Sequence, residues 1–332
     1  MDMTFIDVST TDPAFNLALE QYVFDRMSRD RGYFMLWRND NAIIVGRHQN
    51  TLAEINEDFV RDRGVRVVRR LSGGGAVYHD LGNLNFTYIV DAAQGPRVDL
   101  RLFCQPVAEA LRSLGVDARV NGRNDITIDG RKFSGNAQYV REGRVMHHGT
   151  IMFDSDLTVL GQALQVSREK IETKGVRSVR SRVTNVRPYL PPEVTMDLFK
   201  ARILESVSRG RPMERYDLTA EDAVQVEDLR RRRYDTWEWN YGASPACSAL
   251  RRRRVEGCGT VEAYLRTDRG RLTDVQFRGD FFSAVEPEVL ARRLIGLRPE
   301  EKELRAALEG VYAGLYFTGL DTETLLDILC HG

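Results

Sequence analysis

The chain has 332 residues, and its 48 basic and 48 acidic side chains cancel to a formal net charge of zero at pH 7. A balanced charge argues against a surface built for nucleic acid or for an anionic membrane. No apolar run approaches the roughly 18 residues of a membrane span, the amino terminus lacks a signal-peptide pattern, and the four cysteines form no CxxC pair. These features predict a cytoplasmic protein with reduced thiols and with no nucleic-acid or membrane partner.

The first part of the chain alternates helical and strand patterns. Asp12 followed by Pro13 is typical of a helix N-cap and first turn, and apolar residues then recur at helical spacing up to residue 27. Two short apolar runs, 34–37 and 42–46, flank a turn-prone segment and predict a hairpin. The next expected elements are a helix over 52–63 and a strand at 65–68.

The middle of the chain is rich in strand patterns. Asp129-Gly130 and Glu142-Gly143 are strong turn signals, so we expect strands on either side of each. The expected elements are, in order, a strand at 84–90, a helix at 100–114, strands at 117–121, 125–128, 131–135 and 145–153, and helices at 157–166 and 196–208. Together they predict one mixed or antiparallel sheet with helices on one face.

The tryptophan-containing segment 237–242 marks the expected end of the large domain. After it, Asp268-Arg269-Gly270 predicts a second hairpin, and helices are expected at 287–297, 300–312 and 322–329. We therefore predict an α+β protein with a large domain over 1–245, built from mixed and antiparallel sheets with flanking helices, and a small α+β carboxy-terminal domain over 246–332.

The most informative segment is 69–83, with the sequence RRLSGGGAVYHDLGN. Three consecutive glycines let main-chain N–H groups approach an anion closely, and two arginines precede them. A Walker A loop would continue into Lys-Ser or Lys-Thr, and a dinucleotide fingerprint would open a helix, whereas a strand pattern follows here. The segment predicts an anion-binding loop; a tight turn at a sheet edge is the structural alternative.

A second candidate feature is Lys132, which follows the turn at Asp129-Gly130. Taken alone it is a surface lysine, but the small residues Ser134 and Gly135 beside it leave an open backbone. A basic segment at 174–185 mixes cations, hydroxyls and a glycine, a composition suited to polyphosphate, or to an ordinary solvated loop.

These segments carry a resemblance to a known family. The ordered motifs at 69–83, 122–125 (GRND), 132–135 (KFSG), 147–150 (HHGT) and 174–185 resemble those of lipoate-protein ligases. The resemblance covers about residues 10–245 and extends through 237–242 (WEWNYG) into the small domain. It implies the catalytic fold of the biotin and lipoate ligases.

The resemblance implies a two-step, ATP-dependent reaction. Lipoate attacks the α-phosphate of ATP to give lipoyl-AMP and pyrophosphate, and a lysine amine of the acceptor then displaces AMP. It implies that Lys132 is catalytic, because one cation can stabilise negative charge on the phosphoryl and carbonyl oxygens in turn. It implies nucleotide binding by Arg70, Gly75, Ala76, Val77, Tyr78, Asn83 and Lys132, lipoate binding by Arg70, Gly74, Gly75, His79, Lys132 and His148, and an adenylate loop with Lys174, Ser178, Arg180 and Arg182.

Other residues leave alternatives open. Histidines 79, 147 and 148 could act as bases, but a strand histidine bonded to its neighbours is commoner. The resemblance implies that His79 and His148 line the lipoyl group. Trp37 and the tryptophans of 237–242 could line a tunnel or form core. Mg²⁺ would accompany ATP, with Asp125 as a candidate ligand and the remaining metal ligands unknown.

The resemblance also implies partners. Acceptors would be apo-lipoyl domains of 2-oxoacid dehydrogenase acyltransferase subunits and the glycine-cleavage H protein, with octanoate as a possible second substrate and a monomer as the expected state. Arginine runs at 230–233 and 251–254 are either solvated surface or a rim that attracts acidic acceptors. Rival functions are an octanoyltransferase working through an acyl-cysteine, for which Cys104 is the nearest candidate, a biotin ligase, and a non-catalytic lipoate-binding protein.

Overall fold

The computed structural model describes residues 3–91, 99–121, 125–164, 182–242 and 249–331, which form two compact units. The first unit contains Met1–Ile44, Glu54–Arg69 and Val77–Asn240. The second contains Tyr241–Gly332 together with two short segments, Val45–Ala53 and Arg70–Ala76. Part of the glycine-rich segment therefore belongs with the carboxy-terminal residues. The predicted boundary after residue 245 falls in a stretch outside the described residues and stays a prediction.

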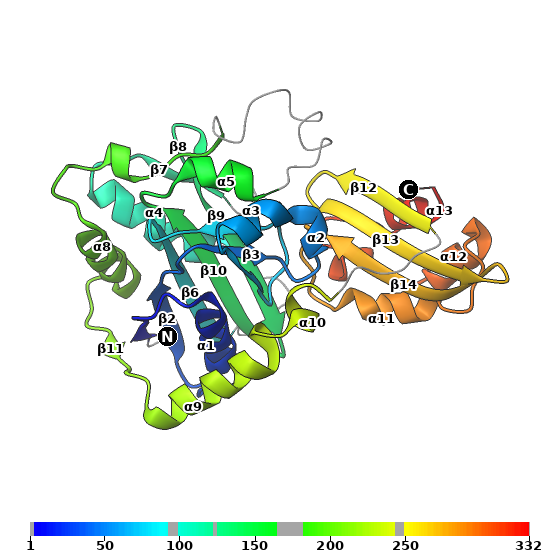
Figure 1. The fold of residues 1–332 in the computed structure, drawn as a ribbon, viewed down its shortest axis with the longest axis horizontal. Coiled ribbons are helices and arrows are strands. Elements are labelled where there is room, and N and C mark those ends of the chain that lie inside the picture. Colours follow the sequence, from blue (N-terminus) through cyan, green and yellow to red (C-terminus); the bar gives the residue numbers. More distant parts are fainter. Residues whose placement is uncertain (1–2, 92–98, 122–124, 165–181, 243–248, 332) are drawn as a thin grey trace. The chain divides into compact units, whose positions relative to one another are not determined.

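The first unit is built on an eight-stranded mixed sheet (Figure 1). Strand β1 runs parallel to β2 and to β11, and the other neighbours are antiparallel. In spatial order the strands are β11 (Glu214–Arg215), β1 (Met3–Asp7), β2 (Gly32–Trp37), β6 (Asn83–Asp91), β10 (Arg144–Met152), β9 (Arg131–Arg141), β8 (Asp125–Ile128) and β7 (Ala118–Asn121). The predicted turns at Asp129-Gly130 and Glu142-Gly143 are confirmed, because all four residues have positive φ.

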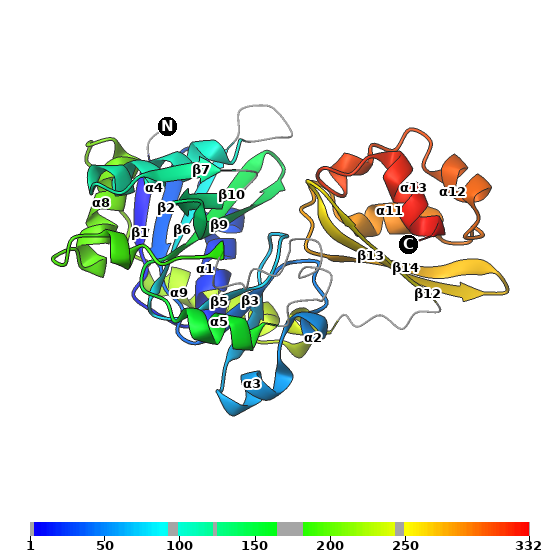
Figure 2. The same cartoon turned by 90° about the horizontal axis from the view of Figure 1, so that it is seen from above.

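Helices cover both faces of this sheet, not one face as predicted (Figures 1 and 2). Helices α4 (Arg101–Ser113) and α8 (Met196–Ser208) pack on one face, and α1 (Pro13–Arg26) and α9 (Ala220–Leu229) pack on the other. Side chains alternate along a strand, so Phe86 and Tyr88 of β6 join the core under α4, whereas Thr87 points to α1. One strand thus supplies an apolar face and a polar face.

The predicted hairpin at 34–37 and 42–46 is wrong. Strand β2 pairs with β1 and β6 in the large sheet, whereas β3 (Ala42–Val45) lies between β4 (Arg66–Arg69) and β5 (Val77–His79) in a separate three-stranded sheet. Both runs are fully buried, so each needs sheet partners on two sides, and a two-stranded hairpin cannot supply them.

The predicted helix over 52–63 is two helices, α2 (Thr51–Glu54) and α3 (Glu57–Asp62). The helix breaks where Ile55 forms a β-bridge with Leu164 and the Asn56 side chain accepts the N–H of Phe59, 3.2 Å away, as an N-cap. Helix α5 (Leu157–Ala163) follows β10, and the 3₁₀ turn η1 (Arg187–Tyr189) lies in the described stretch 182–242. The first unit ends with the π-helical turn η2 (Arg230–Tyr234) and α10 (Trp237–Asn240).

The carboxy-terminal part of the second unit is a three-stranded antiparallel sheet with helices packed on one face (Figure 1). The predicted hairpin at 268–270 joins β13 (Gly259–Asp268) to β14 (Arg271–Gly279), and β12 (Ala249–Val255), which was not predicted, pairs with β13. The helical elements are α11 (Pro287–Leu294), α12 (Glu301–Ala307), η3 (Ala313–Leu315) and α13 (Thr322–Cys330). None of the helices in the described ranges has the length and apolar character needed to cross a membrane.

Candidate active site

Lys132 lies at the start of β9, and its side chain crosses the strand. Its Nζ is 2.7 Å from Oδ1 of Asp125. Asp125 lies in the adjacent strand β8 and pairs there with Gly135 of β9. A Cβ atom on Gly135 would lie 3.0 Å from both Cε and Nζ of Lys132. The pairing shifts by one residue between Ile126 and Thr127, an irregularity of the kind that redirects side chains. Gly135 therefore leaves the path that the lysine side chain follows.

Several of the motif segments named above meet around this lysine. The carbonyl of Lys132 accepts the N–H of Thr184, 2.9 Å away, and Lys132 forms a parallel bridge with Val183, at the end of the basic motif. From the HHGT segment, the Thr150 hydroxyl accepts the N–H of Gly135 at 3.3 Å. Parts of four motifs, at 125, 132–135, 147–150 and 183–185, thus meet in the first unit.

The second half of the glycine-rich motif is joined to the same strands. Asn83 is buried in β6 opposite Met152 of β10, and its amide donates to Asn85 at 2.9 Å. His79 in β5 is buried as well, with its Nδ1 3.1 Å from the Asn39 amide. Val77 and Tyr78 are half-buried in β5. These predicted binding residues therefore have fixed positions within the first unit.

The first half of that motif, residues 70–76, is described within the second unit. The Arg70 side chain is buried and donates to the loop itself, to the Ser72 hydroxyl at 3.0 Å and to the carbonyls of Gly73 and Gly75 at 2.6 and 2.9 Å. Arg70 thus holds the loop's carbonyl groups in one arrangement.

The three glycines of the loop differ in their surroundings. A Cβ on Gly73 would lie 2.3 Å from the carbonyl oxygen of Phe281, and the N–H of Gly74 donates to that same oxygen at 3.2 Å. Gly74 has a φ of +90°, and its Cβ position meets the ring of Phe282 at 3.0 Å. Gly75 has open space within 4 Å of its Cβ position. Two of the glycines are therefore required by packing, and Gly75 is the one that leaves room for a ligand.

A buried polar chain that the sequence analysis missed lies on the α1 face of the large sheet. Glu20, 1% exposed, accepts a hydrogen bond from the Thr87 hydroxyl at 2.5 Å and lies 3.0 Å from Nδ1 of His148. The Trp37 indole N–H donates to the same threonine hydroxyl at 2.9 Å. The sequence signal was an acidic residue among the apolar positions of α1. His148 and Trp37 are consequently tied to one buried carboxyl group.

His147 and Cys104 lie on the opposite face, in the apolar core. The His147 ring stacks against Phe86 and Phe103, and its Nε2 is 4.0 Å from the Cys104 sulfur. Burial, with a smaller effect of His148, holds the pKa of His147 well below its usual range. Burial also raises the pKa of Cys104 to about 12. The Cys104 thiol is thus protonated at neutral pH, which argues against an acyl-cysteine at this position.

The tunnel lining by Trp37 and the tryptophans of 237–242 stays a prediction. Trp237 is 62% exposed, and the Trp239 indole N–H donates to the carbonyl of Arg69 at 2.8 Å. The arginine runs also have local carboxylate partners. Arg230 pairs with Asp12, Glu227 and Asp235, Arg232 with Asp228, Arg252 with Glu262, Arg253 with Asp327 and Arg254 with Asp280. This pairing favours the structural interpretation of both runs.

Some predicted residues cannot be placed. Lys174, Ser178 and Arg180 lie outside the described residues, and Arg182 is half-buried beside the bridge at Val183. Within the described ranges there is no group of three or more His, Cys, Asp or Glu side chains that could hold a metal ion. An ion at this site would need ligands from its substrate.

Comparison with known proteins agrees with this fold and these motifs. Residues 12–208 match the family model of the lipoyl protein ligase A/B catalytic domain, and residues 244–329 match that of the bacterial lipoate protein ligase C-terminus. The chain is 39% identical to lipoate-protein ligase LplJ of Bacillus subtilis, over 98% of this chain and all of that protein. It is 38% identical to lipoate-protein ligase 1 of Staphylococcus aureus, over 96% and 97% of the two chains.

Solved structures of lipoate ligases resemble the fold of this chain. A lipoate-protein ligase A bound with ATP superposes with a TM-score of 0.65 at 27% identity, covering 73% of this chain and 99% of that one. LipL1 of P. falciparum in complex with lipoate shares the fold over 99% of this chain, with a TM-score of 0.81. The fold and the two matched domains define a protein-modifying ligase. The chain belongs to the lipoate-protein ligases, which join lipoate to protein with the use of ATP.

Proposed function

We propose that Lys132 is the catalytic cation of the lipoylation reaction. The observation that carries the proposal is the path of this side chain, which crosses the bare Gly135 and is anchored on both sides by the motifs at 147–150 and 183–185. A cation held in this way can face developing negative charge with little reorganisation, which is the main source of electrostatic catalysis.

The chemistry has two steps. A carboxylate oxygen of lipoate attacks the α-phosphorus of ATP, and the bond to the bridging oxygen breaks, so that pyrophosphate leaves with its electron pair. The acceptor's lysine amine then attacks the carbonyl carbon of lipoyl-AMP, AMP leaves, and the amine loses a proton. Lys132 stabilises the phosphoryl oxygens in the first step and the carbonyl oxygen in the second.

The other binding residues are assigned by the family motif. Arg70, Gly75, Ala76, Val77, Tyr78 and Asn83 hold the nucleotide, while Gly74, His79 and His148 contribute to the lipoyl side. The open space at Gly75 supports its role, because a side chain there would keep a phosphate from the main chain. Arg182, with Lys174, Ser178 and Arg180, contributes the basic loop.

Mg²⁺ would neutralise the departing pyrophosphate. Such ions are usually held by one or two carboxylates and by the phosphates themselves, which fits the Asp125 carboxylate beside Lys132. Asp125, which pairs with Lys132, would be the protein ligand of that ion.

The acceptors are apo-lipoyl domains of 2-oxoacid dehydrogenase acyltransferases and the glycine-cleavage H protein, with octanoate as an alternative acid. The archaeal structure that resembles this chain at 28% identity was described together with its E2 lipoyl domain, which supports this class of acceptor. We place the reaction in the cytoplasm and expect a monomer.

One assay separates the candidate functions. The protein is incubated with ATP, lipoate and an apo-lipoyl domain, and the acceptor is weighed by mass spectrometry. We expect a lipoyl adduct only when ATP is present. Equal modification without ATP from an octanoyl carrier protein would instead indicate a transferase, and an unmodified acceptor under every condition would indicate a binding protein.

A further inference from the structure

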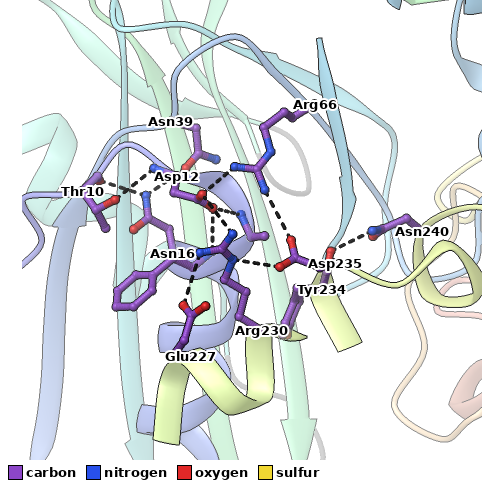
Figure 3. A network of polar contacts seen from close by, with 12 residues as sticks. Thr10, Asp12, Asn16, Asn39, Arg66, Glu227, Arg230, Tyr234, Asp235 and Asn240 are labelled. Atoms are coloured by element: carbon purple, nitrogen blue, oxygen red, sulfur yellow. Dashed lines mark hydrogen bonds and ion pairs between the residues drawn. The ribbon is translucent and has the colours of Figure 1, made fainter. Parts of the chain in front are cut away.

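Strand β4 leads directly into residues 70–76, the proposed nucleotide-binding part of the glycine-rich segment, called the nucleotide loop below. Both ends of β4 contact one segment that is distant in the sequence, residues 230–240. At the amino-terminal end, Arg66 pairs with Asp12 at 2.5 Å and with Asp235 at 3.4 Å (Figure 3). Arg230 pairs with the same two carboxylates, so the network joins α1, β4 and the turn η2. The start of the strand is therefore fixed by charge.

The other end of β4 is fixed by hydrogen bonds to the main chain. Arg69 is 4% exposed, and its N–H donates to Oδ1 of Asn240 at 2.9 Å. Its guanidinium donates to the carbonyls of Trp239 at 2.8 Å and Asn240 at 3.2 Å. In return, the Trp239 indole N–H donates to the carbonyl of Arg69 at 2.8 Å. Both polar main-chain groups of Arg69 are thus bonded to two consecutive residues.

The holding segment is itself rigid. The Asn240 amide donates to the carbonyl of Tyr234 at 2.7 Å (Figure 3), and the Arg233 guanidinium lies 4.8 Å from the centre of the Trp239 ring. Trp239 also packs edge-on against Tyr234. Because the Trp239 side chain is fixed from several sides, the position of its indole N–H is fixed as well.

The carbonyl that Trp239 binds belongs to the peptide group joining Arg69 to Arg70. That group is planar, so the bond to its oxygen holds the last peptide of β4, through which the chain enters Arg70. We infer that Trp239 is a positioning residue for ATP binding, which acts through Arg69 on the nucleotide loop. This inference rests on the proposed role of Arg70 in holding the nucleotide.

The same short helix provides a matched control. Trp237 and Trp239 both belong to α10, but Trp237 is 62% exposed, whereas Trp239 is bonded to Arg69. Replacing either residue by phenylalanine removes an indole N–H and keeps an aromatic ring. Trp239→Phe removes the hydrogen bond to Arg69 that the inference concerns, and Trp237→Phe leaves that bond in place.

The test measures initial rates of lipoyl-AMP formation against ATP concentration, at saturating lipoate, for the whole chain and its Trp239→Phe, Trp237→Phe and Arg70→Lys variants. We expect Trp239→Phe to raise KM for ATP about fivefold, the effect of one lost hydrogen bond, with a smaller change in kcat. Trp237→Phe should match the unmodified chain. Thermal midpoints are recorded for all variants, because a merely structural role of Trp239 would lower the midpoint and leave KM for ATP unchanged.

An unchanged KM for ATP in Trp239→Phe, with a raised KM in Arg70→Lys, would overturn the inference and leave the proposed function standing. Absence of lipoyl-AMP with the unmodified chain would instead overturn the proposed function. If Trp239→Phe does not fold, Arg69→Lys replaces it, since lysine lacks the guanidinium fork that reaches both carbonyls. It should raise KM for ATP in the same way, and an unchanged KM would overturn the inference.

Discussion

The position of the Lys132 side chain depends on Gly135, a neighbour without a side chain. The space over Gly135 lets the lysine fold back toward Asp125, and a methyl group there would be too close to its last two atoms. The proposed catalytic cation is thus positioned by two residues of one strand, of which only the lysine carries charge.

Lys132→Ala should abolish lipoyl-AMP formation while the protein stays folded. Loss of a preorganised donor to a developing anion costs on the order of 3 kcal/mol of barrier, or a rate loss of roughly a hundredfold or more. Lys302→Ala, which alters an exposed lysine of α12, serves as the control. A near-normal adenylate yield in Lys132→Ala would show that the lysine has been assigned wrongly.

Gly135→Ala should reduce the adenylation rate about tenfold or more, because the new methyl group displaces Nζ, yet the lysine remains present. The matched control is Gly161→Ala in α5, where nothing lies within 4 Å of the Cβ position. That change should leave the rate unaltered and stabilise the fold by about 0.5–1 kcal/mol. Equal rates in the two variants would contradict the role given to Gly135.

The sequence singles out Lys132 through a local motif, but it could not show that Glu20 pairs with His148 or that Trp239 bonds to Arg69. Glu20 matters because folding brings it to His148, and Trp239 because folding brings it to Arg69. Both pairings join residues far apart in the chain. In the sequence alone, a buried glutamate and a half-buried tryptophan look like any others of their type.

At the scale of elements, the nucleotide loop combines two kinds of glycine. Gly73 and Gly74 pack against the main chain and ring that follow β14, and Gly75 faces open space. The loop is therefore both a packed structural element and a candidate binding surface, and the two functions can be separated by substitution.

Gly73→Ala should destabilise the protein by about 2 kcal/mol, because its methyl group would meet a carbonyl oxygen that cannot move aside easily. Gly75→Ala should leave the thermal midpoint nearly unchanged and raise KM for ATP by about tenfold, since the methyl group occupies the approach to the main chain. Calorimetry and initial rates measure the two effects. If both variants lost stability equally and bound ATP normally, the division between the glycines would be incorrect.

Elements with strong local signals were predicted correctly. The turns at Asp129-Gly130, Glu142-Gly143 and 268–270 all occur, because residues with positive φ are chosen locally. The predicted hairpin of 34–37 and 42–46 is wrong, because the partners of a strand depend on how all the strands of the chain are arranged into sheets. Strand β12 was missed because its run of four arginines looks like solvated surface, although three of them pair with carboxylates of neighbouring elements.

At the scale of the whole molecule, acid stability should depend on His147. This ring is buried, and its pKa is well below the usual range, so it stays neutral in the folded state. Below about pH 6.5 the unfolded chain binds a proton there and the folded chain does not, so stability falls as the pH falls. The slope from this one group approaches about 1.4 kcal/mol per pH unit.

Urea unfolding at several pH values tests this expectation. The free energy of unfolding should fall between pH 6.5 and 5 in the unmodified chain and fall less in His147→Gln, which cannot take up a proton. The control is His331→Gln, which alters the exposed histidine beside Asp327. Parallel curves for the His147→Gln variant and the unmodified chain would show that His147 does not contribute to acid sensitivity.

The allocation of residues 45–53 and 70–76 to the carboxy-terminal body has a practical consequence for protein engineers. A chimera that joins two homologous ligases at Tyr241 would combine the glycines of one parent with the segment around Phe281 of the other parent. There is no room for even a methyl group on Gly73 or Gly74 beside Phe281 and Phe282. A chimera should therefore take residues 45–53, residues 70–76 and the carboxy-terminal segment from the same parent.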